Sequence, residues 1–137
     1  MREIKFRGYC KDELIGSQWV TNGYGVFNID YVNGKRDTFL ITPYGDYYIY
    51  EESVGQYTGL KDINNIEICE GDIVSFYNDE EYKLNPTTAL VVYEVGAFML
   101  EHKKLGKEYL GEIDIENMCV KVIGNIYENP ELLKMEE

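Results

Sequence analysis

Acidic residues are the side chains of this chain whose types and spacing could support catalysis or metal binding. Glu70 and Asp72 stand on either side of Gly71, and two neighbouring carboxylates can serve as the general acid and base of a hydrolysis. The run Asp79-Glu80-Glu81 could bind Ca²⁺ or Mg²⁺, but it lacks the alternating ligand spacing and the glycine of an EF-hand loop. We interpret the run as a solvated charged segment. We expect Asp72 to cap the turn at Gly71 and Glu70 to make a hydrogen bond or salt bridge.

Other side chains with catalytic or metal-binding chemistry are few. His102 is the single histidine, and two lysines follow it whose charges oppose a bound cation. The three cysteines, Cys10, Cys69 and Cys119, are far apart and form no Cys-x-x-Cys pair, which is typical of reduced, packed or half-exposed thiols. No Walker loop, G-x-S-x-G or G-x-G-x-x-G motif is present. The sequence therefore predicts no catalytic residue, no metal ligand and no bound cofactor.

Turn and strand signals, which must position any site, are densest in residues 56–76. Gly59 and Gly71 can adopt the positive φ that tight turns require. Residues 66–69 alternate apolar with other side chains, and residues 73–76 begin a further strand. A turn cluster whose side chains bond their own backbone separates these signals: Asp62, Asn64 and Asn65. This strand–turn–strand pattern suits the corner of a small, strongly bent barrel.

The same stretch resembles the central signature of the YopX-type proteins of bacteriophages and prophages. The matching segments are residues 56–62 (QYTGLKD), 70–74 (EGDIV), 1–7 (MREIKFR), 122–133 (VIGNIYENPELL) and, more weakly, 91–98 (VVYEVGAF). The family more often has a Trp near Tyr93, and its turn usually reads Asn-Gly where this chain has Asn64-Asn65. The resemblance implies a mainly β fold with an SH3-like barrel in the later half. It implies no reaction, and it supplies no catalytic residues.

The expected fold class is mainly β with a minor α contribution, built from small bent sheets. Asn22-Gly23 and Asn33-Gly34 are dipeptides typical of type I′ turns, and the second predicts a hairpin. Residues 129–131 (Asn-Pro-Glu) predict the start of a short C-terminal helix. Residues 1–137 are expected to form one YopX-like domain. If that domain divides, an N-terminal β lobe covers 1–55 and the SH3-like barrel covers 56–137.

The charge distribution bears on partners and location. The net charge is −12; residues 1–55 carry 6 basic and 8 acidic residues, whereas residues 56–137 carry 7 and 17, a net of −10. Such a field repels phosphate backbones, so direct nucleic-acid binding is not expected. The composition and the opening residues show neither a membrane span nor a signal region, and we expect a protein of the bacterial host cytoplasm.

Tyrosine is over-represented, with 13 of the 19 aromatic residues. Tyr47, Tyr48 and Tyr50 are the candidates for an interaction surface, and alternation places Tyr48 and Tyr50 on one face and Tyr47 with Ile49 on the other. Either another chain covers one of these faces, or both are covered within one monomer.

Three functions remain open at this stage. The first is a phage or prophage accessory protein without enzymatic activity that binds another protein or itself. The second is an acidic decoy, or DNA mimic, that occupies a nucleic-acid enzyme. The third is a small hydrolase that uses Glu70 and Asp72.

Overall fold

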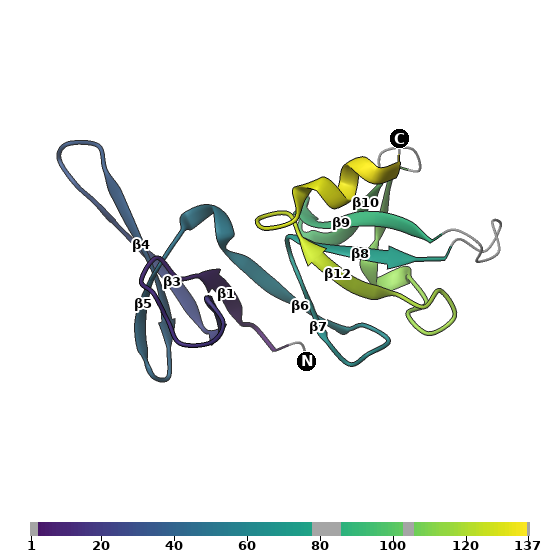
Figure 1. Cartoon of the computed structure of the whole chain (residues 1–137), viewed down its shortest axis with the longest axis horizontal. Coiled ribbons are helices and arrows are strands. Elements are labelled where there is room, and N and C mark those ends of the chain that lie inside the picture. The colour runs from purple at the N-terminus through teal and green to yellow at the C-terminus, as the bar shows by residue number, and fades with distance from the viewer. Residues whose placement is uncertain (1–2, 78–85, 103–105, 137) are drawn as a thin grey trace. The chain divides into compact units, whose positions relative to one another are not determined.

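The computed structural model describes residues 3–77, 86–102 and 106–136, and the regular structure in them is mainly β (Figure 1). This confirms the mainly β part of the predicted fold class, whereas the helices of the described residues are 3-10 helices and not the predicted α contribution. The chain divides into two compact units, Met1–Tyr57 and Thr58–Glu137, called here the N-terminal unit and the C-terminal unit. The predicted charged run Asp79-Glu80-Glu81 and the two lysines after His102 lie outside the described residues.

The N-terminal unit consists of short antiparallel strands. Its elements are β1 (Phe6–Tyr9), β2 (Trp19–Gly23), β3 (Gly25–Asp30), β4 (Arg36–Thr42), β5 (Gly45–Ile49), the 3-10 helix η1 (Glu51–Ser53) and the start of β6 (Gly55–Lys61). β4 lies between β3 and β5 in a three-stranded sheet. β1 pairs with β2 on one side and with the first residues of β6 on the other. β6 then carries the chain into the C-terminal unit.

Two glycines allow the strands of the N-terminal unit to pack closely. Leu40 on β4 and Ile49 on β5 are fully buried. A Cβ atom at Gly23 would lie 2.4 Å from Leu40 Cδ1, and one at Gly8 would lie 2.6 Å from Ile49 Cδ1. The core of this unit therefore depends on residues without a side chain at Gly8 on β1 and Gly23 on β2.

The hairpin predicted at Asn33-Gly34 is present between β3 and β4, but its turn differs from the predicted type I′. Gly34 has a φ of 89°, whereas Asn33 does not have a positive φ. The Tyr31 N–H donates to the Lys35 carbonyl at 2.8 Å, and the Gly34 N–H donates to the Tyr31 carbonyl at 3.0 Å. This is the three-residue loop that ends in a left-handed glycine.

The second predicted type I′ turn, at Asn22-Gly23, is wrong. Both residues belong to β2, which pairs with β1 and not with the next strand. Asn22 has a φ of 62°, so it adopts the left-handed conformation predicted by its type, but within a strand.

The C-terminal unit contains a five-stranded antiparallel sheet in the order β11-β10-β9-β8-β12, of which Figure 1 labels β8, β9, β10 and β12. The strands of that sheet are β8 (Asp72–Phe76), β9 (Thr87–Glu94), β10 (Ala97–His102), β11 (Gly106–Tyr109) and β12 (Lys121–Asn125), and the unit also contains β7 (Glu67–Cys69). β7 lies next to β6. The core side chains of the unit come from β7, β8, β9 and β10 and from the segment before β12: Ile68, Val74, Phe76, Ala89, Val91, Phe98, Leu100, Leu110 and Val120.

A closed SH3-like barrel, which the resemblance implied, is not formed by the described residues. β11 and β12 are the two edges of the five-stranded sheet and do not pair. The chain between them forms the 3-10 helix η2 (Leu110–Glu112) and a run of turns, so it supplies no closing strand.

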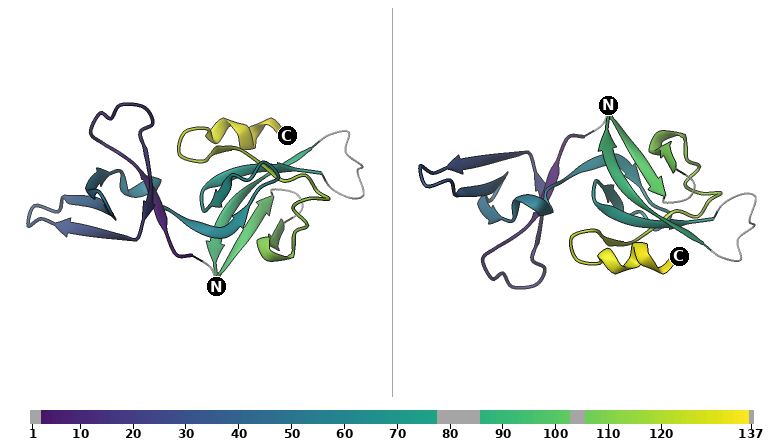
Figure 2. Two further views of the ribbon diagram at one scale, coloured as in Figure 1. Left: turned by 90° about the horizontal axis from the view of Figure 1, so that it is seen from below. Right: turned by 90° about the horizontal axis from the view of Figure 1, so that it is seen from above.

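The C-terminal helix is a 3-10 helix, η3 (Pro130–Glu136), which lies beside β9 (Figure 2). The predicted α-helical cap at Asn129 is not made. Its Oδ1 accepts the Asn125 N–H at 3.2 Å, and its carbonyl accepts the Leu132 N–H at 3.1 Å. The first turn of η3 therefore has the i→i+3 bonding of a 3-10 helix.

The turn cluster predicted after β6 is organised by one buried carboxylate. Asp62 is 5% exposed. Its Oδ1 accepts the N–H groups of Asn64 at 2.8 Å and Ile66 at 2.9 Å, and its Oδ2 accepts the Val122 N–H at 2.9 Å. The alternation predicted for residues 66–69 holds only in part, because Ile66 is 50% exposed and precedes the strand.

The turn between β9 and β10 is a type I′ turn, and it contains a valine. Val95 and Gly96 have φ values of 51° and 78° between the paired residues Glu94 and Ala97. A β-branched residue is strained in the left-handed region, where asparagine is tolerated.

We expect Val95→Asn to stabilise the C-terminal unit by about 1 kcal/mol, because it removes this strain. Urea unfolding of the purified variant measures the change. Val32, which is also fully exposed but lacks a positive φ, provides the control, and Val32→Asn should give no gain. A Val95→Asn protein no more stable than the wild type would contradict the strain.

Candidate functional site

The central motif has a structural role in this structure. Gly59 and Gly71 have φ values of 91° and 92°, so both adopt the positive φ that was expected of them. Gly71 lies in the turn before β8, whereas Gly59 lies within strand β6 and not in a turn. The Gly71 N–H donates to the Val91 carbonyl at 2.8 Å, and its carbonyl accepts the Ile126 N–H at 2.8 Å. Asp72 accepts the Cys69 N–H at 2.8 Å, which closes the turn before β8.

The geometry around Glu70 and Asp72 does not favour the hydrolase hypothesis. Asp72 is 1% exposed, and one of its carboxylate oxygens is engaged by the Cys69 N–H. Glu70 is half-buried. A general acid or base must reach the substrate, and a carboxylate as buried as Asp72 does not.

The remaining chemical candidates also lie apart from one another. Cys10 and Cys69 are buried, Cys119 is half-buried, and all three are free thiols, as predicted. Within residues 3–77, 86–102 and 106–136, no three His, Cys, Asp or Glu side chains are grouped so that they could hold a metal ion.

In the same residues, no helix has the length and apolar character needed to cross a bilayer.

The most distinctive surface is a continuous row of rings on one face of the N-terminal unit, which we call the aromatic face. All six rings are half-buried. They belong to β1, β2, β3, β4 and β5 and to the residue after β5: Trp19, Tyr9, Tyr50, Tyr48, Phe39 and Phe27.

Cross-strand pairing places one half of this row. Phe39 pairs with Phe27 on β3 and with Tyr48 on β5. The ring centroids of Phe27 and Phe39 are 5.0 Å apart and nearly parallel, and those of Phe39 and Tyr48 are 5.4 Å apart. Such aromatic cross-strand pairs stabilise a sheet, but here they also leave ring surface exposed.

The other half of the row is joined to the first by a lysine. Lys11 Nζ lies 4.6 Å from the Tyr48 ring centroid and 5.2 Å from that of Tyr50. Tyr50 lies 6.3 Å from Tyr9, which contacts Trp19 edge-on at 5.3 Å. The cation–π contacts of Lys11 therefore make the two halves one surface.

A carboxylate lies within the aromatic face. Asp37 accepts the hydroxyls of Tyr31 and Tyr48 at 2.7 Å each. The Tyr31 hydrogen bond, followed by that of Tyr48 and the charges of Lys11 and Lys35, lowers the pKa of Asp37. The same hydrogen bond raises the pKa of Tyr31, because it favours the protonated phenol.

The three predicted tyrosines do not form one surface. Tyr48 and Tyr50 lie on the aromatic face, as their alternation predicted. Tyr47 pairs with the buried Leu40 and lies on the opposite face, with the fully buried Ile49. One face is therefore covered within the unit, and the other remains half-exposed.

We expect Tyr48→Phe to raise the pKa of Asp37 back toward its ordinary value, because the carboxylate loses one donor. Carbon NMR of the carboxyl group across acidic pH measures the change. Since the folded pKa is lowered, Asp37 stabilises the folded unit at neutral pH, and this contribution is lost as the pH falls through that pKa. Tyr44→Phe, at a highly exposed tyrosine outside the row, should leave the titration unchanged. An identical Asp37 titration in the wild type and Tyr48→Phe would contradict the assignment.

Four of the six rings were not predicted from the sequence: Tyr9, Trp19, Phe27 and Phe39. The alternation of side chains along a strand assigns Phe27 and Phe39 each to one face of its own strand, but it does not show that the two faces meet. No local signal shows that β1 continues beside β5, where Lys11 N–H donates to the Tyr48 carbonyl at 2.7 Å and Tyr50 N–H donates to the Tyr9 carbonyl at 3.0 Å.

Comparison with known proteins shows which family the chain belongs to. A model of the YopX protein family matches residues 5–134. The chain belongs to the YopX family, which confirms the resemblance of its motifs. No curated protein matches the chain.

Solved structures match over almost the whole length. Protein EF1440 from Enterococcus faecalis is 25% identical, with 97% of this chain and 99% of that chain covered and a TM-score of 0.54. Protein YopX from Bacillus subtilis is 18% identical, with 97% of each chain covered and a TM-score of 0.54. The second likeness is one of fold alone.

Proposed function

We propose that this chain is a protein-binding module without enzymatic activity, an accessory protein of a phage or prophage that acts in the bacterial cytoplasm. The observation that carries the proposal is the aromatic face, a row of six half-buried rings on one side of the N-terminal unit. Tyr and Trp side chains offer large contact area at a low cost in side-chain entropy, and they are enriched at binding hot spots. The phage origin and the location rest on the family resemblance.

Charge favours a basic partner over a second copy. The chain carries a net charge of −12, so two copies repel each other. The aromatic face itself presents Asp37 between two tyrosine hydroxyls. A partner with apolar side chains beside Lys or Arg would satisfy both features.

The acidic decoy is the competing hypothesis, and it is favoured by the net charge of −10 on residues 56–137. A decoy would bind through carboxylates, so its complex would weaken steeply with salt. Binding through the aromatic face depends more on apolar contact and less on salt.

For the architecture, we propose that the C-terminal unit is an opened SH3-like barrel. The support is the run of three consecutive antiparallel strands, β8, β9 and β10, with a 3-10 helix before the last strand. β12 returns to pair with β8.

The test is affinity capture from bacterial extract at low and high salt with the wild type, Phe39→Ala and Tyr44→Ala. Phe39 lies between two rings of the row, whereas Tyr44 is exposed in the β4–β5 turn. We expect at least one protein that the wild type and Tyr44→Ala retain and Phe39→Ala loses by about tenfold, a loss of about 1.4 kcal/mol. Circular dichroism should confirm that both variants are folded.

Three results would count against the proposal. If Phe39→Ala captured the same proteins as the wild type, the aromatic face would be excluded as the binding surface. If the wild type captured proteins at low salt and lost them at high salt, the acidic decoy would be favoured. Sedimentation of the purified chain as a dimer that Phe39→Ala dissociates would replace the basic partner with a second copy.

A further inference from the structure

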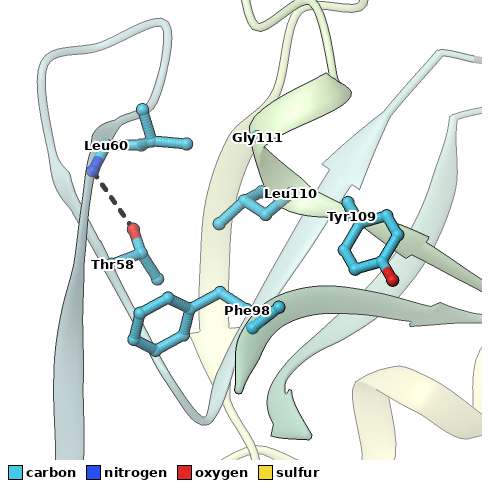
Figure 3. Close-up of a pocket in the computed structure, with 7 residues that line it drawn as sticks. Thr58, Leu60, Phe98, Tyr109, Leu110 and Gly111 are labelled. Carbon is cyan, nitrogen blue, oxygen red and sulfur yellow. Dashed lines mark hydrogen bonds between the residues drawn. The ribbon is translucent and has the colours of Figure 1, made fainter. Parts of the chain in front are cut away.

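The C-terminal unit contains a pocket that the aromatic face does not involve (Figure 3). Its volume is about 360 Å³, and its lining comes from β6, the start of β10, the end of β11 and η2: Thr58, Leu60, Ala97, Phe98, Tyr109, Leu110 and Gly111. In Figure 3 the side chains of Leu60 and Leu110 point toward each other across this space. Ligand pockets typically span roughly 300–1,000 Å³, so this one suits a single large side chain.

The wall of the pocket is apolar in its chemistry. Phe98 and Leu110 are buried and belong to the core of the unit. Thr58, the one polar side chain of the inner wall, has its hydroxyl engaged: it donates to the Ile68 carbonyl at 2.7 Å and accepts the Leu60 N–H at 3.2 Å. An apolar group is therefore the occupant that this wall favours.

The residues around the end of β11 have a different chemistry. Tyr109 lines the pocket and is 53% exposed, so part of its side chain is in water. Glu108 and Glu112 directly flank the lining segment, and both are exposed. Neither has an ion pair within the described part of the chain, whereas the nearby Lys107 contacts Glu94 and Glu101.

We propose that this pocket binds one aliphatic or aromatic side chain of a basic protein segment, with Lys or Arg residues of that segment near Glu108 and Glu112. Charge complementarity favours this occupant: Glu108 and Glu112 are exposed beside the lining segment and have no ion pair among the described residues, and residues 56–137 carry a net charge of −10. An acidic segment would be repelled, and a basic segment without an apolar anchor would leave the pocket empty. The site lies wholly within the C-terminal unit and does not depend on the aromatic face.

The probes are three capped tripeptides, Lys-Leu-Lys, Lys-Ser-Lys and Glu-Leu-Glu, added to the full chain with methyl NMR of Ala97 and Leu110 as the readout. We expect Lys-Leu-Lys to shift both methyl signals with millimolar affinity, weakened by salt. The other two peptides should bind at least about tenfold more weakly. Lys-Ser-Lys or Glu-Leu-Glu binding as well as Lys-Leu-Lys would overturn the proposal, and so would no shift with Lys-Leu-Lys.

Two variants locate the binding. Gly111 lines the pocket, and a Cβ atom there meets nothing within 4 Å. Gly111→Leu therefore adds a side chain at the lining without a clash of its Cβ atom, and we expect it to weaken Lys-Leu-Lys binding by about tenfold. Glu112→Gln should weaken it a few-fold, whereas Glu116→Gln, at an exposed acid outside the lining, should not. Unchanged binding by Gly111→Leu would refute the pocket.

Phe39→Ala separates this site from the proposed function. It should bind Lys-Leu-Lys like the wild type, even if its capture of proteins is lost. Loss of peptide binding in Phe39→Ala would place the peptide on the aromatic face and overturn the pocket assignment.

Discussion

Asp62→Ala is expected to destabilise the C-terminal unit by roughly 3–5 kcal/mol, because it leaves three backbone donors without their acceptor. The carboxylate accepts the N–H groups of Asn64, Ile66 and Val122, and it is almost completely buried. Hydrogen bonds to a charged group contribute more than neutral ones, and a buried donor without a partner is costly. Urea unfolding of the variant measures the loss.

The matched control is Glu116→Ala in the same unit. The Glu116 side chain is exposed, and no described residue bonds to it, so the change should lie within about 0.5 kcal/mol of the wild type. An Asp62→Ala protein as stable as Glu116→Ala would show that solvent replaces the carboxylate. The turn cluster would then not be the element that ties β6 to the start of β12.

Gly23→Ala is expected to destabilise the N-terminal unit by about 1–3 kcal/mol through overpacking. The added Cβ would lie 2.4 Å from Leu40 Cδ1 and 2.6 Å from Leu40 Cγ. Leu40 is fully buried, so its side chain has little room to withdraw.

Gly25→Ala provides an internal comparison two residues further along the chain. There the nearest atom to the added Cβ is Ile41 Cδ1 at 3.6 Å, an ordinary contact, and the residue has no positive φ. Gly25→Ala should be neutral or slightly stabilising, because it restricts the unfolded chain. Equal stabilities of Gly23→Ala and Gly25→Ala in urea unfolding would show that the two sheets do not approach as closely as described.

Features set by neighbouring residues could be predicted from the sequence. The positive φ of Gly71 and the capping of its turn by Asp72 follow from residue types within a few positions of each other. The bond from Asp62 to Val122 spans 60 residues, and no local pattern indicates it. No local pattern indicates the open edge of the five-stranded sheet either, because it depends on the path of the segment after β11.

Turn types illustrate how a local signal can mislead. Asn33-Gly34 predicted a type I′ turn, but the hairpin has a three-residue loop. The reason is that Tyr31 and Lys35 form the closing hydrogen-bonded pair, which leaves three residues between them. Val95-Gly96 forms the type I′ turn although valine opposes it. There the register of β9 and β10 overrides the residue preference.

The aromatic face could be predicted only in part. Alternation correctly separated Tyr48 and Tyr50 from Tyr47, since side chains along a strand alternate between faces. The ring row also needs the register of β3 on β4 and the approach of Lys11 to β5. These are tertiary arrangements, so the tyrosine excess indicated a surface but not its members.

The most direct test of the central claim is photo-crosslinking in bacterial cells with a photoreactive phenylalanine analogue placed at Phe27. Phe27 stands at one end of the row, where it contacts Phe39 alone among the described rings, and it is half-buried, so the analogue can replace it with little effect on packing. The same analogue at Tyr44 is the control, because Tyr44 is highly exposed and outside the row. We expect irradiation to give a discrete covalent adduct with a protein from position 27 and none from position 44. Equal adducts from both positions, or none from position 27, would contradict recognition through the aromatic face.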